Sequence, residues 1–422
     1  MNIIRGYSQK IDDQFILRVS TGSKDDLDRI LELNITVHGE ETRKYISDLF
    51  LEHPRREEVL WLYIEDINTN KIVSGLTLCP LEWIIEDITI PICEMGFVGT
   101  LEPYRGRGFI VKLNDLFKKA MDERNYVFSV IRGIPYYYRR LDYEFVFPLD
   151  DRIILLTNKV PDNEYGNLKI RRAQEQDLNL IQTLYDYYYK QFFIFNKFDR
   201  EAFVYRFFKE KFNNNRLSTY IIEDTDQAVA YFSIGLSYDN LACTINVPRL
   251  TSQQMIKVLQ FVKKIYENEN NLEIQFHVNQ DSEFGKFIIS LGGIPIYRYG
   301  WQLNIPNLAL FFQTIKPIIE KRIKNSIFRD LSRNLIISNY RENIELTFIN
   351  GKLTEIRHYK GYPDENVSDL RIPGSILFKL LLSDKSMEEL NYIMDDAIVK
   401  PSSKLLIDII FPKKNSYPDT YY

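Results

Sequence analysis

The stretch FVGTLEPYRGRGFIVKLNDLF, residues 97–117, places a turn rich in glycine and arginine between an apolar strand and an amphipathic helix. Backbone amides at such a junction can converge on one anion, and the helix amino terminus adds partial positive charge. Gly106 and Gly108 have no Cβ, so a bulky anion can approach the main chain closely. Arg105 and Arg107 add cationic charge for phosphate oxygens. The turn therefore predicts a pyrophosphate site, the alternative being a tight surface turn with solvated arginines.

Length and composition limit what surrounds this turn. The chain has 422 residues, 45% of them hydrophobic and 27% charged, which predicts two or three folded domains. A formal net charge of −4 makes nucleic acid a poor candidate for the main partner. Three cysteines without CxxC spacing, no signal peptide and no long apolar run together predict a cytoplasmic protein without a membrane span.

Hydrophobic periodicity divides the chain into three parts. Up to about residue 160 it predicts a strand, two helices, three strands, the helix after the glycine turn and a further strand. A similar order restarts near residue 167, but VPRLTSQQM stands where the glycine turn is expected, which indicates a diverged second copy. From about Trp301 the pattern changes to a helix, a hairpin around Asn350-Gly351 and further helices. The predicted domains are residues 1–160, 161–300 and 301–422.

Two motifs carry a family resemblance. Arg105-Gly106-Arg107-Gly108-Phe109-Ile110 resembles the Arg/Gln-x-x-Gly-x-Gly/Ala motif of the GNAT superfamily of acyl-CoA-dependent acetyltransferases, with Ile110 in place of the last small residue. YYRRLDYEF, residues 137–145, resembles the Tyr-x-Arg-Phe-Gly-Tyr signature of the Eis-type (enhanced intracellular survival) branch. Tyr138 has the leading position and Tyr143 the last one, whereas Leu141 and Asp142 replace Phe-Gly.

The resemblance implies an α+β architecture of two tandem GNAT folds followed by a sterol-carrier-protein-like α/β domain. It also implies acetyl-CoA as acyl donor, a primary amine as acceptor (polyamine-like, aminoglycoside-like or a lysine), a direct ternary complex and a hexamer. The predicted coenzyme site comprises Val98, Gly99, Thr100, Arg105, Gly106, Arg107, Gly108, Phe109, Ile110, Val111, Gly133 and Ile134.

Two groups are predicted to take part in catalysis. Tyr138 is the candidate acid that protonates the departing thiolate, and the alternative is a core aromatic residue. The resemblance implies that the terminal carboxylate of Tyr422 attracts the amine and collects its proton, and the alternative is a frayed tail. The four histidines have no metal spacing, so no metal is expected.

Two other function classes remain open. One is a catalytically silent protein that binds acyl-CoA or lipid on the same scaffold. The other is nucleic-acid binding by the arginine turn, which predicts a steep dependence on salt.

Overall fold

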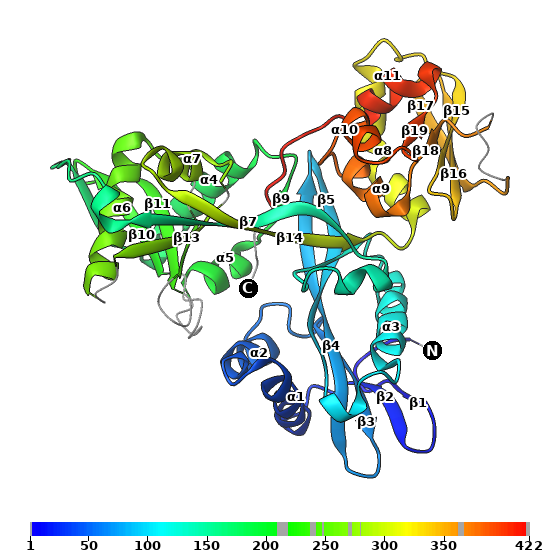
Figure 1. Ribbon diagram of the computed structural model, residues 1–422, viewed down its shortest axis with the longest axis horizontal. Helices are drawn as coiled ribbons and strands as arrows, with labels where there is room; N and C mark the ends of the chain where they lie inside the picture. Colours follow the sequence, from blue (N-terminus) through cyan, green and yellow to red (C-terminus); the bar gives the residue numbers. More distant parts are fainter. Residues whose placement is uncertain are drawn as a thin grey trace.

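The structure, a computed structural model, describes residues 2–208, 218–236, 242–246, 249–268, 272–278, 280–361 and 367–418. The described residues form three lobes that meet where strands β5, β7, β9 and β14 lie close together (Figure 1). A sheet of 14 strands runs through the first two lobes, and a separate five-stranded sheet forms the third. The site discussed below lies in the first lobe, on strand β5 and helix α3.

The first lobe contains six strands of the large sheet and three helices. Its strands are β1 (Ser8–Lys10), β2 (Phe15–Val19), β3 (Leu60–Asp66), β4 (Lys71–Ile85), β5 (Ile88–Thr100) and β6 (Ser129–Ile131). Its helices are α1 (Lys24–His38), α2 (Thr42–Leu51) and α3 (Phe109–Glu123). Ser23 caps α1 by accepting a hydrogen bond from the Asp26 amide at 3.1 Å, as its position before an acidic first turn favours. In α3, Leu113, Phe117 and Ala120 are fully buried, and this apolar stripe fixes the helix on the sheet.

The second lobe contains eight described strands of the large sheet and four described helices. Its strands are β7 (Glu144–Leu156), β8 (Leu168–Arg172), β9 (Ile194–Asn196), β10 (Ser218–Asp224), β11 (Gln227–Leu236), β12 (Ala242–Asn246), β13 (Glu273–Val278) and β14 (Ile294–Asn304). Its helices are α4 (Leu178–Tyr189), α5 (Arg200–Phe207), α6 (Ser252–Asn268) and α7 (Glu283–Ser290). From β8 to β13 the element order is similar to that of the first lobe, with β9 as an additional strand between α4 and α5, and the second copy stays a prediction.

Strands β7 and β14 join the two lobes into one sheet. The strand order in this region is β5-β6-β14-β7-β13, so β14 lies between β6 and β7, far from β6 in sequence. Gln302 of β14 pairs with Ile131 on one side and Phe145 on the other. We predicted two separate folds from the sequence, and hydrophobic periodicity gave no signal that β14 would lie between β6 and β7.

The third lobe packs four helices on one small sheet. The sheet has the order β17-β16-β15-β18-β19, and the chain enters it through helix α8. Its strands are β15 (Arg333–Ser338), β16 (Asn343–Ile349), β17 (Lys352–His358), β18 (Leu370–Arg371) and β19 (Ile398–Val399). Its helices are α8 (Leu308–Lys324), α9 (Gly374–Leu381), α10 (Met387–Ile393) and α11 (Pro401–Ile410). The predicted hairpin at Asn350-Gly351 connects β16 to β17.

The predicted domain boundaries remain predictions. The one at residue 160 falls just after the short helix η3 (Thr157–Lys159), and the one at residue 300 falls inside β14.

Candidate active site

Strand β5 is distorted at the point where the site begins. Its register with β4 shifts between the pairs Gly75↔Gly99 and Thr77↔Gly96, which places an extra residue on β5. Phe97 lies within this bulge and has a φ of 49°, an uncommon value for a residue with a Cβ. On its other side, β5 pairs with β6 only at Cys93 and Glu94. From Met95 onward the two parallel strands diverge, and the edge of β5 toward β6 has no described strand beside it.

The glycine turn follows β5 through a short 3-10 helix, η1 (Glu102–Tyr104). The Arg105 amide donates to the Glu102 carbonyl at 3.2 Å, so the available amides begin at Gly106 rather than at Arg105. Gly106 and Gly108 have φ values of 79° and 75°, and a Cβ on either would meet nothing within 4 Å. These glycines are therefore required by backbone conformation and leave open space in front of the main chain.

Helix α3 begins directly after the turn and has no side-chain cap. Gly108 is its N-cap residue, and no side chain accepts the amides of the first turn. These amides have no intrahelical partner, and the helix dipole places partial positive charge beside them. The turn and the helix start thus form an uncapped donor cluster of the kind that binds phosphate.

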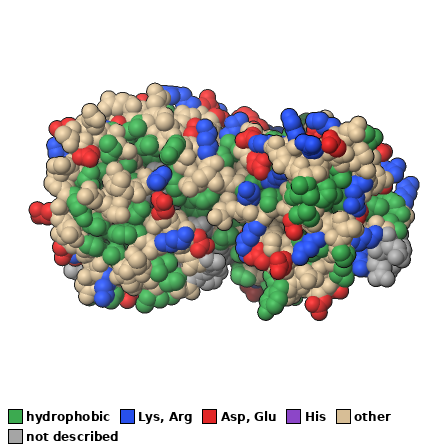
Figure 2. Space-filling model, turned by 90° about the horizontal axis from the view of Figure 1, so that it is seen from above, with side chains coloured by type: hydrophobic (Ala, Val, Ile, Leu, Met, Phe, Trp, Pro, Cys, Tyr) green, Lys and Arg blue, Asp and Glu red, His purple; other side chains and the backbone are tan. Residues whose placement is uncertain are grey.

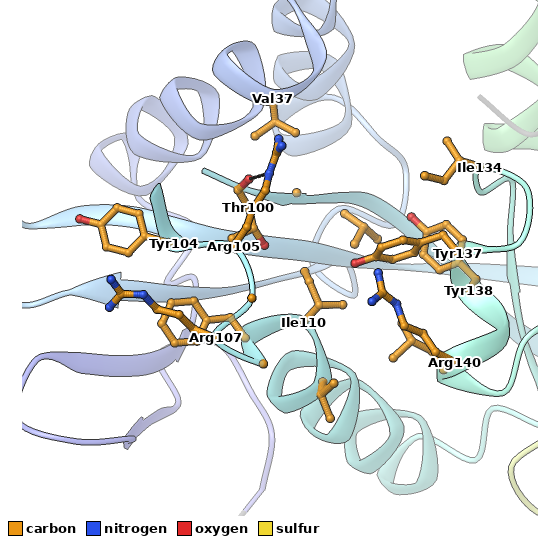
Figure 3. A pocket seen from close by; sticks show the side chains of 17 residues that line it. Val37, Thr100, Tyr104, Arg105, Arg107, Ile110, Ile134, Tyr137, Tyr138 and Arg140 are labelled. Carbon is orange, nitrogen blue, oxygen red and sulfur yellow. Dashed lines mark hydrogen bonds between the residues drawn. The ribbon is translucent and has the colours of Figure 1, made fainter. Parts of the chain in front are cut away.

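A cavity of about 630 Å³ connects this donor cluster to the second motif. Figure 3 shows Tyr104, Arg105 and Arg107 toward one end of it and Tyr137, Tyr138 and Arg140 toward the other, with Ile110 between them. The lining contains three arginines and no acidic side chain. Of the predicted site residues, it brings together Val98, Gly99, Thr100, Arg105, Gly106, Arg107, Gly108, Phe109, Ile110, Val111, Ile134 and Tyr138.

Among the described residues, one predicted site residue does not line the cavity, and another predicted residue lies outside the described ranges. Gly133 lies behind Tyr138, because a Cβ at this position would overlap Cε2 and Cδ2 of the Tyr138 ring. Tyr422 lies outside the described residues, which end at Pro418.

Tyr138 is held in a 3-10 helix, η2 (Tyr137–Leu141), with only 7% of the side chain exposed. Its ring packs edge-on against Tyr137 and Tyr143, at centroid distances of 5.0 Å and 6.3 Å. The Tyr143 hydroxyl shares a 2.6 Å hydrogen bond with the Ser129 hydroxyl, and burial raises the pKa of Tyr143 well above its ordinary value. Tyr143 therefore remains a neutral packing partner, whereas Tyr137 and Tyr138 both line the cavity.

Several lining residues were not predicted: Val37, Tyr104, Tyr137, Arg140 and Leu141. The Arg107 guanidinium lies 5.3 Å from the Tyr104 ring centroid, and that of Arg140 lies 3.7 Å from the Tyr137 centroid. Both arginines are therefore kept beside the cavity by aromatic rings. The tyrosines and arginines of residues 137–140 were a possible signal for the contact of Arg140 with Tyr137. No nearby residue in the sequence indicated that Val37 on α1 would line the cavity.

Arg132, which follows β6, forms a buried ion pair with Glu94 on β5, and the sequence did not predict this pair. Arg132 Nε donates to Glu94 Oε1 at 2.8 Å, and Glu94 is only 3% exposed. Burial raises the pKa of Glu94, although Arg132 opposes this shift. The Arg132 guanidinium also lies 5.7 Å from the centroid of the Trp301 ring on β14.

Neither metal ligands nor membrane helices were found in the part of the chain that the structure describes. No three His, Cys, Asp or Glu side chains gather there as metal ligands would, and no described helix is long and apolar enough to cross a bilayer. The prediction that the reaction uses no metal stays a prediction.

Comparison with known proteins identifies the domain that carries the site. Residues 18–146 match the family described as "Acetyltransferase (GNAT) domain". No curated protein sequence matches the chain.

Solved structures resemble almost the whole chain at low sequence identity. A probable N-acyltransferase from Enterococcus faecalis V583 has a TM-score of 0.72 and 13% identity over 96% of this chain and 100% of that one. Eis1 from Mycobacterium abscessus has a TM-score of 0.61 and 10% identity over 97% and 100%. N-myristoyltransferase from Saccharomyces cerevisiae, solved with myristoyl-CoA, has a TM-score of 0.53 and 12% identity over 71% and 85%. The chain thus has a GNAT acyltransferase fold with mixed α and β content.

Proposed function

We propose that this enzyme, whose residues 18–146 carry a GNAT acetyltransferase domain, transfers an acetyl group from acetyl-CoA to a primary amine in a ternary complex. The observation that carries the proposal is the single cavity that contains both the uncapped glycine turn and Tyr138. Its three arginines and free amides suit the phosphates of coenzyme A. The exposed edge of β5 suits the pantetheine arm, which pairs with a free strand edge as an added strand does.

Each group then has a role in the proposed reaction. The amine nitrogen attacks the thioester carbonyl carbon, and amides near the bulge in β5 stabilise the oxyanion that forms. The carbon–sulfur bond breaks, and the Tyr138 hydroxyl donates its proton to the departing thiolate. A phenol and a thiol have ordinary pKa values of about 10 and about 8.5, close enough for this transfer.

The proton lost by the amine is assigned to the terminal carboxylate of Tyr422. An α-carboxyl has an ordinary pKa of about 3.5, so it does not deprotonate a free ammonium efficiently. It attracts the cationic acceptor and takes the proton after attack, when the nitrogen becomes strongly acidic. An acceptor with several amines, polyamine-like or aminoglycoside-like, suits a site of this kind, and a protein lysine is a narrower variant.

Three further expectations are proposed on resemblance: a tandem pair of GNAT folds, a sterol-carrier-protein-like third domain at residues 301–422, and a hexamer. A cytoplasmic location is proposed on the cysteine pattern and on the lack of a signal peptide in the sequence. Nucleic-acid binding is disfavoured: on the face seen in Figure 2, Lys and Arg side chains are interspersed with Asp and Glu rather than gathered in one basic area.

The decisive experiment compares Tyr138→Phe with Tyr136→Phe. Tyr136 is two residues away, 78% exposed, and does not line the cavity, so it is a matched control. Thiol release from acetyl-CoA with mixed amines should fall by about 10²-fold in kcat for Tyr138→Phe, with unchanged coenzyme affinity. Coenzyme binding without thiol release in the unaltered protein would instead support the silent binding module.

A further inference from the structure

Asp142 follows the short helix that carries Tyr138 and stands where the Eis-type motif has glycine. It ends η2 with a φ of 66° and a ψ of 21°, in the left-handed region that glycine adopts at the lowest cost. The Asp142 amide donates to the carbonyls of Tyr138 and Arg139, so its position is linked to that of the candidate acid. What aspartate adds to a glycine at this place is a carboxylate.

The Asp142 carboxylate contacts two basic side chains from separate parts of the chain. Its Oδ2 accepts a hydrogen bond from Lys118 Nζ on α3 at 3.1 Å, and its Oδ1 accepts one from Arg341 Nη1 at 3.2 Å. Arg341 is 199 residues away in sequence, in the turn between β15 and β16 of the third lobe. One carboxylate therefore joins the η2 segment to the helix that begins at the glycine turn and to the third lobe.

The turn that carries Arg341 is held by contacts of its own. Asn339 Oδ1 accepts hydrogen bonds from the amides of Arg341 and Glu342 at 2.9 Å and 2.7 Å. The Tyr340 hydroxyl donates to the Asp396 carbonyl at 2.6 Å. The guanidinium thus extends from a fixed backbone, although the Arg341 side chain is 84% exposed.

A second cavity lies on the side of η2 that faces the third lobe. It has a volume of about 560 Å³, and its lining comes from α3, the η2 segment, the link between β14 and α8, the β15–β16 turn and the start of α9. Tyr138, Arg140 and Leu141 line the first cavity, whereas Arg139 and Asp142 line the second. The helix η2 is therefore a wall between two cavities, and ion pairs reach it across the second one.

Strand β14 holds the two ends of the segment that contains Tyr138. Gln302 donates from Nε2 to the Gly133 carbonyl at 2.7 Å, and Asn304 donates from Nδ2 to the Leu141 carbonyl at 3.1 Å. Both bonds are buried. Asp142 comes directly after the second of these contacts, so its ion pairs add a link to the third lobe at the point where η2 ends.

We propose that Asp142 is a positioning residue for Tyr138, and that the third lobe acts on acyl transfer through Arg341. The two ion pairs stabilise the orientation of η2 in which the Tyr138 hydroxyl reaches the departing thiolate. The inference rests on the proposed role of Tyr138 as the acid. Each exposed ion pair changes such an equilibrium by at most about fivefold, so loss of both should lower kcat by about three- to tenfold.

The first test is Asp142→Gly, which removes both ion pairs and relieves the left-handed backbone. Thiol release at saturating acetyl-CoA and amine should show the three- to tenfold loss in kcat of about this size. Acetyl-CoA affinity should stay within about twofold, because the glycine turn and the start of α3 are unchanged. The free energy of unfolding in urea should not fall. An unchanged kcat in this variant would mean that Asp142 only ends the helix, and would overturn the proposal.

Arg341→Glu tests the third lobe without a change beside Tyr138. Like charges then face each other at Asp142, so kcat should fall by about threefold or more, whereas Arg341→Lys keeps a cation and most of the turnover. Arg329→Glu is the matched control, because Arg329 is a third-lobe arginine, 74% exposed, that pairs with its neighbour Asp330. In the Asp142→Gly chain, Arg341→Glu should cause no further loss. Equal effects of Arg341→Glu and Arg329→Glu would refute the action of the third lobe through this pair, even if Asp142→Gly folded poorly.

Ionic strength gives a readout that a packing role would not change. Raising NaCl from about 0.05 M to about 0.5 M screens exposed ion pairs, so kcat should fall in the unaltered chain and stay level in Asp142→Asn. Tyr138→Phe separates this inference from the proposed function. Full turnover in Tyr138→Phe would contradict both, whereas its loss there, with full turnover in Asp142→Gly and Arg341→Glu, would contradict the positioning role alone.

Discussion

The contact between Gly133 and Tyr138 makes Gly133→Ala a sharp test of the candidate acid. A Cβ at position 133 would overlap Cε2 and Cδ2 of the Tyr138 ring. The ring has little freedom to move away, because it is 93% buried and packs against Tyr137 and Tyr143. The Gly133 carbonyl also accepts the buried Gln302 bond, so the backbone is restrained as well.

The expected size of the effect follows from this geometry. Inserting one methyl group into a filled site costs about 1–3 kcal/mol. We expect the protein to relieve most of this strain by a displacement of the Tyr138 ring. A shift of about 1 Å at a catalytic group lowers the rate by about 10²-fold. Acetyl-CoA affinity should stay within about twofold, because the glycine turn and the start of α3 are untouched.

The assay is steady-state thiol release combined with calorimetric titration of acetyl-CoA. The change should be made in both the unaltered chain and Tyr138→Phe, where it should cost little because the hydroxyl is already missing. Gly166→Ala, with nothing within 4 Å of the added Cβ, is the control. Unchanged kcat in a well-folded Gly133→Ala protein would refute the argument that the position of Tyr138 governs turnover.

Three further predictions test other features. Gly108→Ala must adopt a φ near 75°, which costs about 1–2 kcal/mol, so calorimetry should show acetyl-CoA affinity about tenfold lower; unaltered affinity would mean that the turn does not hold the coenzyme. Burial lowers the pKa of His53 to about 4, so the unfolded state binds a proton below pH 6.5 that the folded state excludes. The free energy of unfolding, measured by urea titration, should therefore fall by about 2 kcal/mol between pH 7 and pH 5. His53→Asn should remove this dependence on pH, and an equal dependence in both proteins would show that the His53 imidazole is not its source. A few residues added after Tyr422 should impair turnover, and a fully active extended protein would reject the role of its carboxylate.

Local chemistry made the first lobe largely predictable. Ser23 before an acidic turn gave the start of α1, and the apolar stripe of residues 109–120 gave α3. Gly106 and Gly108 were predicted to open the main chain to an anion, and both have left-handed φ values over open space. In each case the signal and the structure involve residues only a few positions apart.

What the sequence did not predict depends on partners far away in the chain. Arg132 and Glu94 are 38 residues apart, and their ion pair forms only because β5 and β6 lie in parallel. The Gln302 bond to the Gly133 carbonyl spans 169 residues, and periodicity shows which face a strand buries but not which strand lies beside it. Gly133 was predicted to bind the coenzyme because the sequence does not show that the Tyr138 ring occupies the space where its Cβ would lie.

The position of β14 between β6 and β7 has a consequence for attempts to produce the first lobe as a separate fragment. A fragment that stops at residue 160 would leave β6 with a bare edge and β7 without the neighbours on its two sides, β13 and β14. Exposed edges of this kind lead to aggregation, so we do not expect residues 1–160, which contain the candidate site, to fold as a separate fragment. Splitting the gene at this point and producing both fragments together should restore a soluble particle where neither fragment does so alone.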